Sequence, residues 1–166
     1  HLESFRRELE SNAVLRADFP ELCAPSRRRG GATVADNRGA MQTGSGFVFT
    51  ARGVDSGNLG MKVADRRPDL IICDDLEPGE SNYSTAQAAK RLVTLLDDIL
   101  PLNIGARVVL VGTTTMAGSI TDTMRERADL GDKAAAATRW VADEGFEVTV
   151  SRALATNDDG TRRSIW

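Results

Sequence analysis

The sequence predicts an α/β fold in which a mostly parallel sheet is flanked by helices and preceded by a β-hairpin insertion. Residues 70–73 and 107–111 are short, mainly apolar runs bounded by polar residues, as expected of parallel strands covered on both faces. Residues 84–100, between them, have a helical pattern. A strand, a helix and a second strand in this order form the βαβ unit of a parallel sheet.

The composition predicts one globular domain and excludes several kinds of site. The chain has 166 residues, of which 41% are hydrophobic, enough to bury a core. Its one histidine is His1, which argues against Ser-His-Asp triads and histidine metal sites. Cys23 and Cys73 match neither a disulfide framework nor a zinc spacing, which favours an intracellular compartment.

The charge and the hydrophobic runs limit the partners. A net charge of −3 argues against a broadly basic nucleic-acid-binding protein. No apolar run approaches the roughly 20 residues that span a bilayer, so no membrane partner is expected. The chain begins without Met and is expected to be a fragment of something longer.

The first part of the chain is predicted to be helical. Residues 2–18 have a helical period that is interrupted near Ser11 and Asn12. Either residue can cap a second short helix, which is expected to end before Pro20.

A β-like region follows a polar loop that contains Arg27, Arg28 and Arg29. Residues 36–39 are a plausible hairpin turn, and residues 53–68 read as a loop. The strand candidates are residues 32–35, 40–43 and 46–51.

The helix between the two core strands is predicted to begin at Ser84 or Thr85 and to end at Pro101. A second helix is expected over residues 120–128, and a further strand over residues 147–150. The apolar stripe of the first helix consists of Ala88, Leu92, Leu95, Leu96 and Ile99.

Acidic residues directly follow the first core strand, in the manner of a Walker B motif. Functional residues of open parallel sheets gather at the carboxyl ends of the strands. There, Asp74 is expected to coordinate Mg²⁺, and Asp75 to orient or deprotonate the attacking water. Glu77 is the alternative base. The competing interpretation is an ordinary strand followed by a polar turn.

The second core strand ends in small hydroxyl residues. Thr113 and Thr114 can hydrogen-bond to a phosphate oxygen or to the lytic water, and can change partners after hydrolysis. Alternatively, threonine simply favours strand ends and caps the helix near Ser119. Because one helix joins both strands, the two polar strand ends together are a more specific sign of a functional site than either end alone.

Several arginines are candidates for phosphate contacts. Arg52 follows a predicted strand and can reach phosphates as an arginine finger. Arg66, Arg67 and residues 27–29 can contact DNA phosphates. For each of them, a solvated surface charge is the competing interpretation.

A P-loop is absent from the sequence. The motif Gly-x-x-x-x-Gly-Lys-Ser/Thr cradles phosphates with backbone amides and a lysine. Its nearest imitation runs to Lys62, where Met61 separates glycine from lysine and Val63 replaces the hydroxyl residue. A P-loop enzyme would therefore carry this motif outside the 166 residues, and the fragment alone is expected to be inactive.

The stretch from Leu15 to Glu80 resembles the ATPase domain of the large terminase subunit of tailed phages. Its most specific part is Arg-Pro-Asp-Leu-Ile-Ile-Cys-Asp-Asp over residues 67–75, and residues 108–113 are similar to the family's coupling motif. The resemblance implies a fragment of a RecA-like P-loop (ASCE) ATPase core. Its parts would be a helical lead-in (1–20), a β-hairpin region (30–53), the core (69–150) and the start of a linker to a nuclease domain (151–166).

The resemblance also implies a function. The intact protein would hydrolyse ATP with Mg²⁺ to translocate double-stranded viral DNA into procapsids in the host cytoplasm. Its partners would be the portal protein, the small terminase subunit and further copies in a ring, and a nuclease domain would cut the DNA. Many relatives have Glu where this chain has Asp75, so Glu77 stays open as the base. The alternatives are a helicase-type or other P-loop ATPase, and a degenerate, non-catalytic module for assembly or DNA docking.

Overall fold

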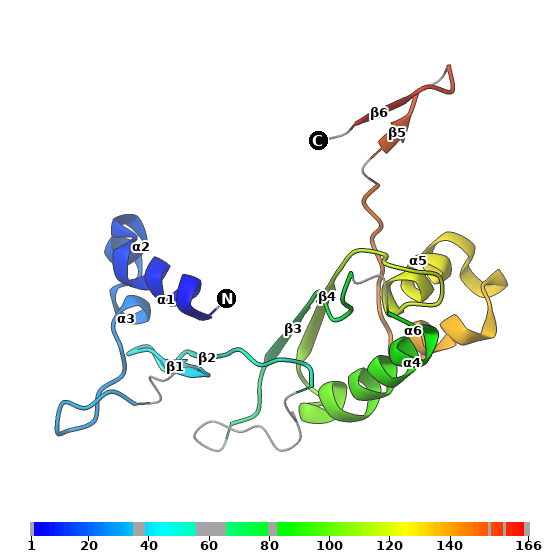
Figure 1. Cartoon of the computed structure of the whole chain (residues 1–166). Coiled ribbons are helices and arrows are strands. Elements are labelled where there is room, and N and C mark those ends of the chain that lie inside the picture. The colour runs from blue at the N-terminus through cyan, green and yellow to red at the C-terminus, as the bar shows by residue number, and fades with distance from the viewer. Residues whose placement is uncertain are drawn as a thin grey trace. The chain divides into compact units, whose positions relative to one another are not determined.

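A computed structural model describes residues 2–34, 39–55, 66–79, 83–152, 154–157 and 159–164. The chain divides into two compact units, His1–Pro68 and Asp69–Trp166, called unit 1 and unit 2 below (Figure 1). The division falls immediately before the first core strand. Composition alone predicted a single domain and gave no sign of this boundary.

Unit 1 begins with short helices separated by residues that cap or break them. Asn12 caps α2, because its side-chain oxygen accepts a hydrogen bond of 3.0 Å from the N–H of Leu15. Pro20 occupies the first turn of α3, where its missing N–H leaves no helical hydrogen bond unmade. The interruption near Asn12 and the stop before Pro20 are thus confirmed. The helices are α1 (Leu2–Ser11), α2 (Ala13–Asp18) and α3 (Pro20–Cys23).

Two of the three strand candidates in unit 1 form an antiparallel hairpin, made of β1 (Ala40–Gln42) and β2 (Val48–Thr50). The connection between them is closed by the N–H of Thr43, which donates to the carbonyl of Phe47 at 2.9 Å. The turn expected at 36–39 lies mostly outside the described residues. Residues 32–34 are not a strand, since only an isolated bridge from Thr33 is present there.

The core of unit 1 lies between α1 and this hairpin. Leu2 and Leu9 of α1 are buried with Met41 of β1. The ring of Phe5 stacks on that of Phe49, with centroids 4.6 Å apart. The helix and the hairpin therefore stabilise each other by covering apolar side chains that neither could bury alone.

Unit 2 contains the predicted βαβ unit. Strands β3 (Leu70–Asp74) and β4 (Arg107–Val111) are parallel, and α4 (Thr85–Val93) lies between them in sequence. A capping box starts α4: the N–H of Ser84 donates to Gln87 Oε1 at 2.8 Å, and the N–H of Gln87 donates to Ser84 Oγ at 3.3 Å. The helical path continues through a π-helical segment and a final 3₁₀ turn that contains Pro101, close to the predicted end.

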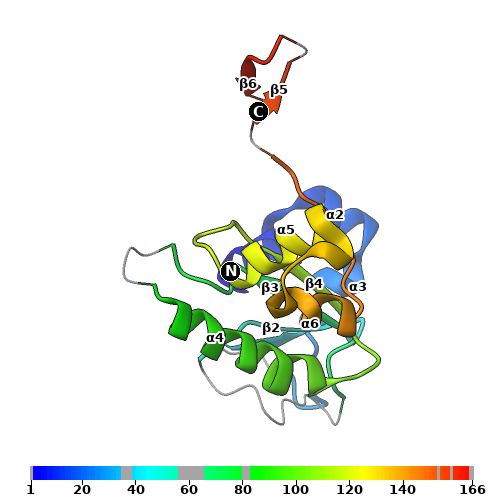
Figure 2. The same ribbon diagram turned by 90° about the vertical axis from the view of Figure 1, so that its right-hand side faces the viewer.

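The β3–β4 pair is covered on one face. α4, α5 (Ile120–Leu130) and α6 (Arg139–Asp143) lie on the same side of it (Figures 1 and 2). Cover on both faces was predicted; within unit 2, the described helices cover one of them. Alternate side chains stay open because no described element of unit 2 packs on the second side. The exposed residues are Leu70 (53%), Ile72 (58%), Val109 (45%) and Val111 (54%).

The core of unit 2 fills the space between the sheet and the helices. Trp140 is 8% exposed, donates from its ring N–H to Thr123 Oγ1 at 3.3 Å and meets Phe146 edge to face. Trp140 is therefore a packing residue of this core. The other buried apolar residues of this core are Cys73, Ala88, Leu95, Ile99, Leu102, Ile120, Met124 and Val141.

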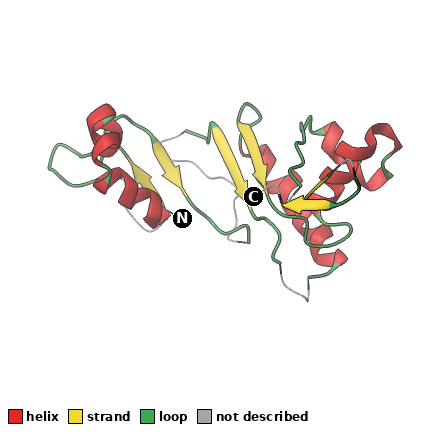
Figure 3. Ribbon diagram, turned by 90° about the horizontal axis from the view of Figure 1, so that it is seen from above, coloured by secondary structure: helices red, strands yellow, loops and turns green. Residues whose placement is uncertain are grey.

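The end of unit 2 departs from the prediction at one place. Residues 147–150 form no strand: their side chains alternate between exposed and half-buried, but no described strand pairs with them. After this segment, β5 (Leu154–Thr156) and β6 (Arg162–Ser164) form a small antiparallel hairpin (Figure 3). Among the described helices, none has the length and apolar character needed to cross a membrane.

Candidate functional site

The polar ends of β3 and β4 lie side by side, as the βαβ pattern predicted. Asp74 pairs with Val111, and the N–H of Asp75 donates to the Val111 carbonyl at 3.0 Å, which extends the ladder by one residue. A pocket of about 430 Å³ opens where the two strands end. Its lining residues are Asp75, Glu77, Pro78, Gly79, Thr113, Thr114 and Thr115.

Asp75 has a backbone conformation that few side chains adopt. Its φ is +45°, in the left-handed region, and among the described residues it is the one non-glycine residue with positive φ. Side chains alternate along a strand, and this turn ends the alternation. Asp75 lines the pocket, whereas Asp74 is exposed at the strand end, on the open face of the sheet with Ile72.

Glu77 is buried and forms hydrogen bonds through both of its oxygens. It is 6% exposed. Its Oε1 accepts from the N–H of Ile120 at 2.8 Å and from the hydroxyl of Tyr83 at 3.0 Å. Its Oε2 accepts from the N–H of Thr121 at 3.1 Å. These N–H groups belong to the first turn of α5, which has no helical acceptor for them, and a carboxylate also suits the positive end of the helix dipole.

This arrangement assigns Glu77 a structural task. A general base needs a lone pair directed at the reacting proton, and the oxygens of Glu77 already accept hydrogen bonds from α5 and Tyr83. Burial and the hydrogen bond to Glu77 raise the pKa of Tyr83 to about 12, so its hydroxyl stays a donor at neutral pH. Of the two candidate bases, the geometry favours Asp75.

Thr121 connects the loop after β4 to the same helix end. Its hydroxyl lies 3.0 Å from the carbonyl oxygen of Thr113 and 3.3 Å from Glu77 Oε2, so these acceptors compete for its one proton. The first turn of α5 therefore holds the loops after both strands. The sequence patterns considered above did not indicate Tyr83 or Thr121; they indicated only a cap near Ser119 at the start of this helix.

Gly112, directly after β4, lies close to the side chain of Thr121 in α5. A Cβ at this position would lie 2.9 Å from the Cγ2 methyl of Thr121 and 3.8 Å from Asp75 Oδ1. The Thr121 side chain cannot rotate away without losing its contacts to Glu77 and Thr113. The absence of a side chain at Gly112 is therefore a requirement of the site.

Gly112→Ala is expected to lower the free energy of unfolding by about 1–3 kcal/mol, the usual cost of overpacking. Urea unfolding followed by circular dichroism measures it. Gly79→Ala is the matched control, because Gly79 lines the same pocket but a Cβ there meets nothing within 4 Å. Equal stability of the two variants would show that the Thr121 contact does not constrain the loop.

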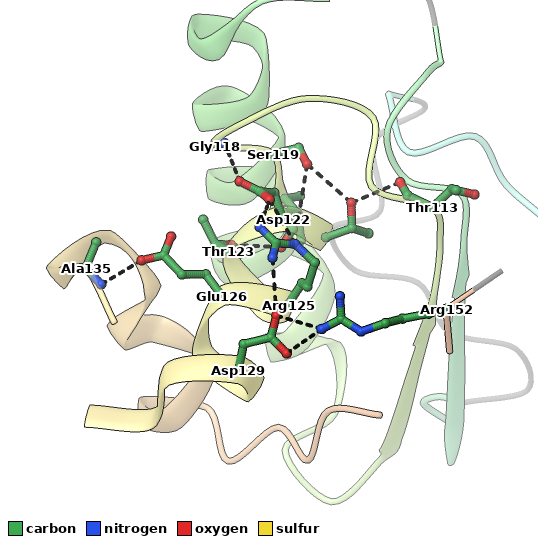
Figure 4. Close-up of polar contacts among 12 residues, drawn as sticks. Thr113, Gly118, Ser119, Asp122, Thr123, Arg125, Glu126, Asp129, Ala135 and Arg152 are labelled. Carbon is green, nitrogen blue, oxygen red and sulfur yellow. Dashed lines mark hydrogen bonds and ion pairs between the residues drawn. The ribbon is translucent and has the colours of Figure 1, made fainter. Parts of the chain in front are cut away.

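A chain of ion pairs runs along α5 (Figure 4). Asp122 accepts from the N–H of Gly118 at 2.9 Å and from Nη2 of Arg125 at 2.7 Å. Arg125 and Arg152 both donate to Asp129, at 3.3 Å and 3.0 Å. Desolvation acts to raise the pKa of Asp122, but the hydrogen bonds from Arg125 and Gly118 outweigh it and hold this pKa below its ordinary value.

The lowered pKa of Asp122 predicts a loss of stability in acid. Because the unfolded chain binds this proton more readily, the contribution is complete above the ordinary value of 3.8 and is lost as the pH falls through the lowered folded pKa. Asp122→Asn is therefore expected to melt at a lower temperature than the parent at pH 7, with the difference narrowing at about pH 3. Thermal melts across this range test it, and a constant difference would contradict the assignment.

Asp74 and Asp75 provide oxygen ligands that suit Mg²⁺. Neither carboxylate forms an ion pair among the described residues, and both are exposed. No group of three or more His, Cys, Asp or Glu side chains in that part of the chain could hold a metal by itself. Mg²⁺ takes one or two carboxylates and completes its shell with water and substrate phosphates, so an exposed aspartate at a strand end has the right ligand chemistry for it.

The remaining candidate, Arg52, belongs to the other unit. It follows β2 in unit 1 and is exposed, whereas all the residues that line the pocket belong to unit 2.

Comparison of the chain with protein-family models, with curated proteins and with solved structures gave no match.

Proposed function

We propose that this chain is part of the ATPase domain of a phage terminase large subunit, and that the pocket at the ends of β3 and β4 takes the phosphate end of ATP. The observation that carries the proposal is one pocket lined by Asp75 and by Thr113, Thr114 and Thr115, from two parallel strands joined by a helix. In open parallel sheets, ligands bind at this end of the strands.

The pocket residues supply distinct contacts in this proposal. Asp75 positions the attacking water and accepts its proton, because its carboxylate lines the pocket without an ion-pair partner in the described chain. The hydroxyls of Thr113 and Thr114 donate to phosphate oxygens. Asp74 would hold Mg²⁺, which would neutralise phosphate charge when bound. Arg52 is kept as a candidate arginine finger.

The wider proposal concerns the intact protein. Its fold would be a RecA-like P-loop ATPase core, with the Gly-Lys-Ser/Thr loop and a nuclease domain outside these 166 residues. The reaction would be ATP hydrolysis coupled to the movement of double-stranded DNA into procapsids in the host cytoplasm. The portal protein, the small terminase subunit and other copies in a ring would be its partners.

Activity measurements on the full-length protein test this proposal. We expect DNA-stimulated ATP hydrolysis that requires Mg²⁺, DNA packaging into purified procapsids, and a P-loop motif in the reading frame upstream of residue 1. Hydrolysis accompanied by duplex unwinding, without packaging, would indicate a helicase instead. A reading frame with no P-loop, together with no ATP hydrolysis, would overturn the assignment in favour of a non-catalytic module.

A further inference from the structure

A folded loop in unit 1 presents three consecutive arginines. The arginine loop, residues 26–34, is attached to the hairpin because the N–H of Ser26 donates to the carbonyl of Gln42 in β1 at 2.9 Å. Its tip is closed by 2.8 Å hydrogen bonds from the N–H of Arg28 to the Ala32 carbonyl and from the N–H of Gly31 to the Arg28 carbonyl. In Figure 1 this blue loop extends away from α1–α3.

Among the described residues, the arginines of the loop have no acidic partner. Residues 27–33 are all exposed, and no acidic residue occurs between Glu21 and Asp36. Arg27 donates to the carbonyl of Gly31 at 2.9 Å, which fixes its guanidinium against the tip. In the described chain none of the three forms an ion pair. Five described arginines elsewhere pair with carboxylates, whereas Arg7 and Arg16 form no ion pair with a described residue; the loop differs because its three arginines are consecutive. The paired arginines are Arg6, Arg125, Arg127, Arg139 and Arg152.

The backbone at the tip is also open to an anion. No described residue accepts a hydrogen bond from the N–H of Arg29 or of Gly30. A Cβ at Gly30 or Gly31 would meet nothing within 4 Å, so the glycines leave the tip bare. Gly31 has a φ of +85°, which makes glycine the residue of choice at that position. Adjacent free N–H groups without side chains over them favour the binding of oxyanions.

We propose that the arginine loop binds the phosphodiester backbone of a nucleic acid. Guanidinium groups match phosphate oxygens with paired, charge-assisted hydrogen bonds, which lysine cannot form. Small anionic ligands bind in concave pockets, whereas this loop is exposed along its length and suits an extended polyanion. The net charge of −3 does not prevent the contact, because charges beyond roughly 8 Å are screened at physiological salt. The inference does not depend on ATP hydrolysis.

Binding of a fluorescein-labelled 30-base-pair DNA duplex to the full chain, without ATP or Mg²⁺, tests the proposal. We expect the triple variant Arg27→Ala, Arg28→Ala, Arg29→Ala to weaken binding at least tenfold at 50 mM salt. The slope of log K against log salt should fall by up to about 3, since each lost phosphate contact removes roughly 0.9. Replacement of the same three residues by lysine should give an intermediate affinity.

The matched control removes equal charge from exposed positions elsewhere, by Arg7→Ala, Arg16→Ala and Arg139→Ala. Circular dichroism melts establish that both variants are folded. An equal loss of affinity in the control would overturn the proposal in favour of general electrostatics. Absence of duplex binding by the parent chain would also overturn it, and binding of an acidic protein in place of DNA would identify a different partner class. ATP hydrolysis at the strand-end pocket is measured separately on the full-length protein, so that part of the proposed function and this inference can fail independently.

Discussion

Asp75→Asn is expected to lower kcat for ATP hydrolysis by the full-length protein at least a hundredfold. The substitution keeps the size of the side chain but removes the lone pair that takes a proton, and general-base catalysis is worth about 10²–10⁴-fold. Of the two aspartates at the end of β3, Asp75 is the one that lines the pocket. Asparagine tolerates its left-handed φ of +45° as well as aspartate does. Steady-state kinetics of phosphate release measure the effect.

Two companion variants separate the roles at this strand end. Asp74→Ala is expected to raise the Mg²⁺ concentration needed for half-maximal rate, because it removes the carboxylate at the end of β3 that is proposed to hold the ion. Asp97→Asn removes the same charge from an exposed helical position and should leave the kinetics unchanged. Wild-type kcat in Asp75→Asn would contradict its role as the base.

The proximity of Asp75 and Thr113 was predictable because it depends on local patterns and topology. Two apolar runs separated by a helix usually form neighbouring parallel strands, whose carboxyl ends lie together. The capping residues Asn12 and Ser84 were predictable for the same reason, since a cap acts within three residues of itself. Elements defined by short-range chemistry were therefore placed correctly.

The features that sequence patterns missed depend on contacts between distant residues. In the sequence, Glu77 is only an alternative candidate for the base. Its hydrogen-bond donors, the N–H groups of Ile120 and Thr121, lie about 43 positions later and cannot be recognised from a local pattern. The pattern of residues 147–150 fits a strand, but a strand also needs a partner, and none of the described strands supplies one. Likewise an apolar run such as β3 does not reveal how many of its faces are covered.

Glu77→Ala is expected to lower the free energy of unfolding of the chain by about 3 kcal/mol. It would leave the N–H groups of Ile120 and Thr121 without their acceptor, and a buried donor without a partner costs about 1–3 kcal/mol. It would also remove a negative charge from the first turn of α5, where the helix dipole favours it. Urea unfolding measures the change, and Glu147→Ala, at an exposed position, is the control.

The amide variant distinguishes a structural acceptor from a catalytic base. Glu77→Gln keeps one carbonyl oxygen for α5, so about half of the loss in Glu77→Ala should return. If Glu77 only positions the loops, Glu77→Gln should also restore most of the ATP hydrolysis that Glu77→Ala loses. In the glutamine variant the loop after β3 remains attached to the start of α5. The same helix end holds Thr113, through the hydroxyl of Thr121. A stable Glu77→Gln protein without activity would instead make Glu77 the base, and Asp75→Asn would then retain its kcat.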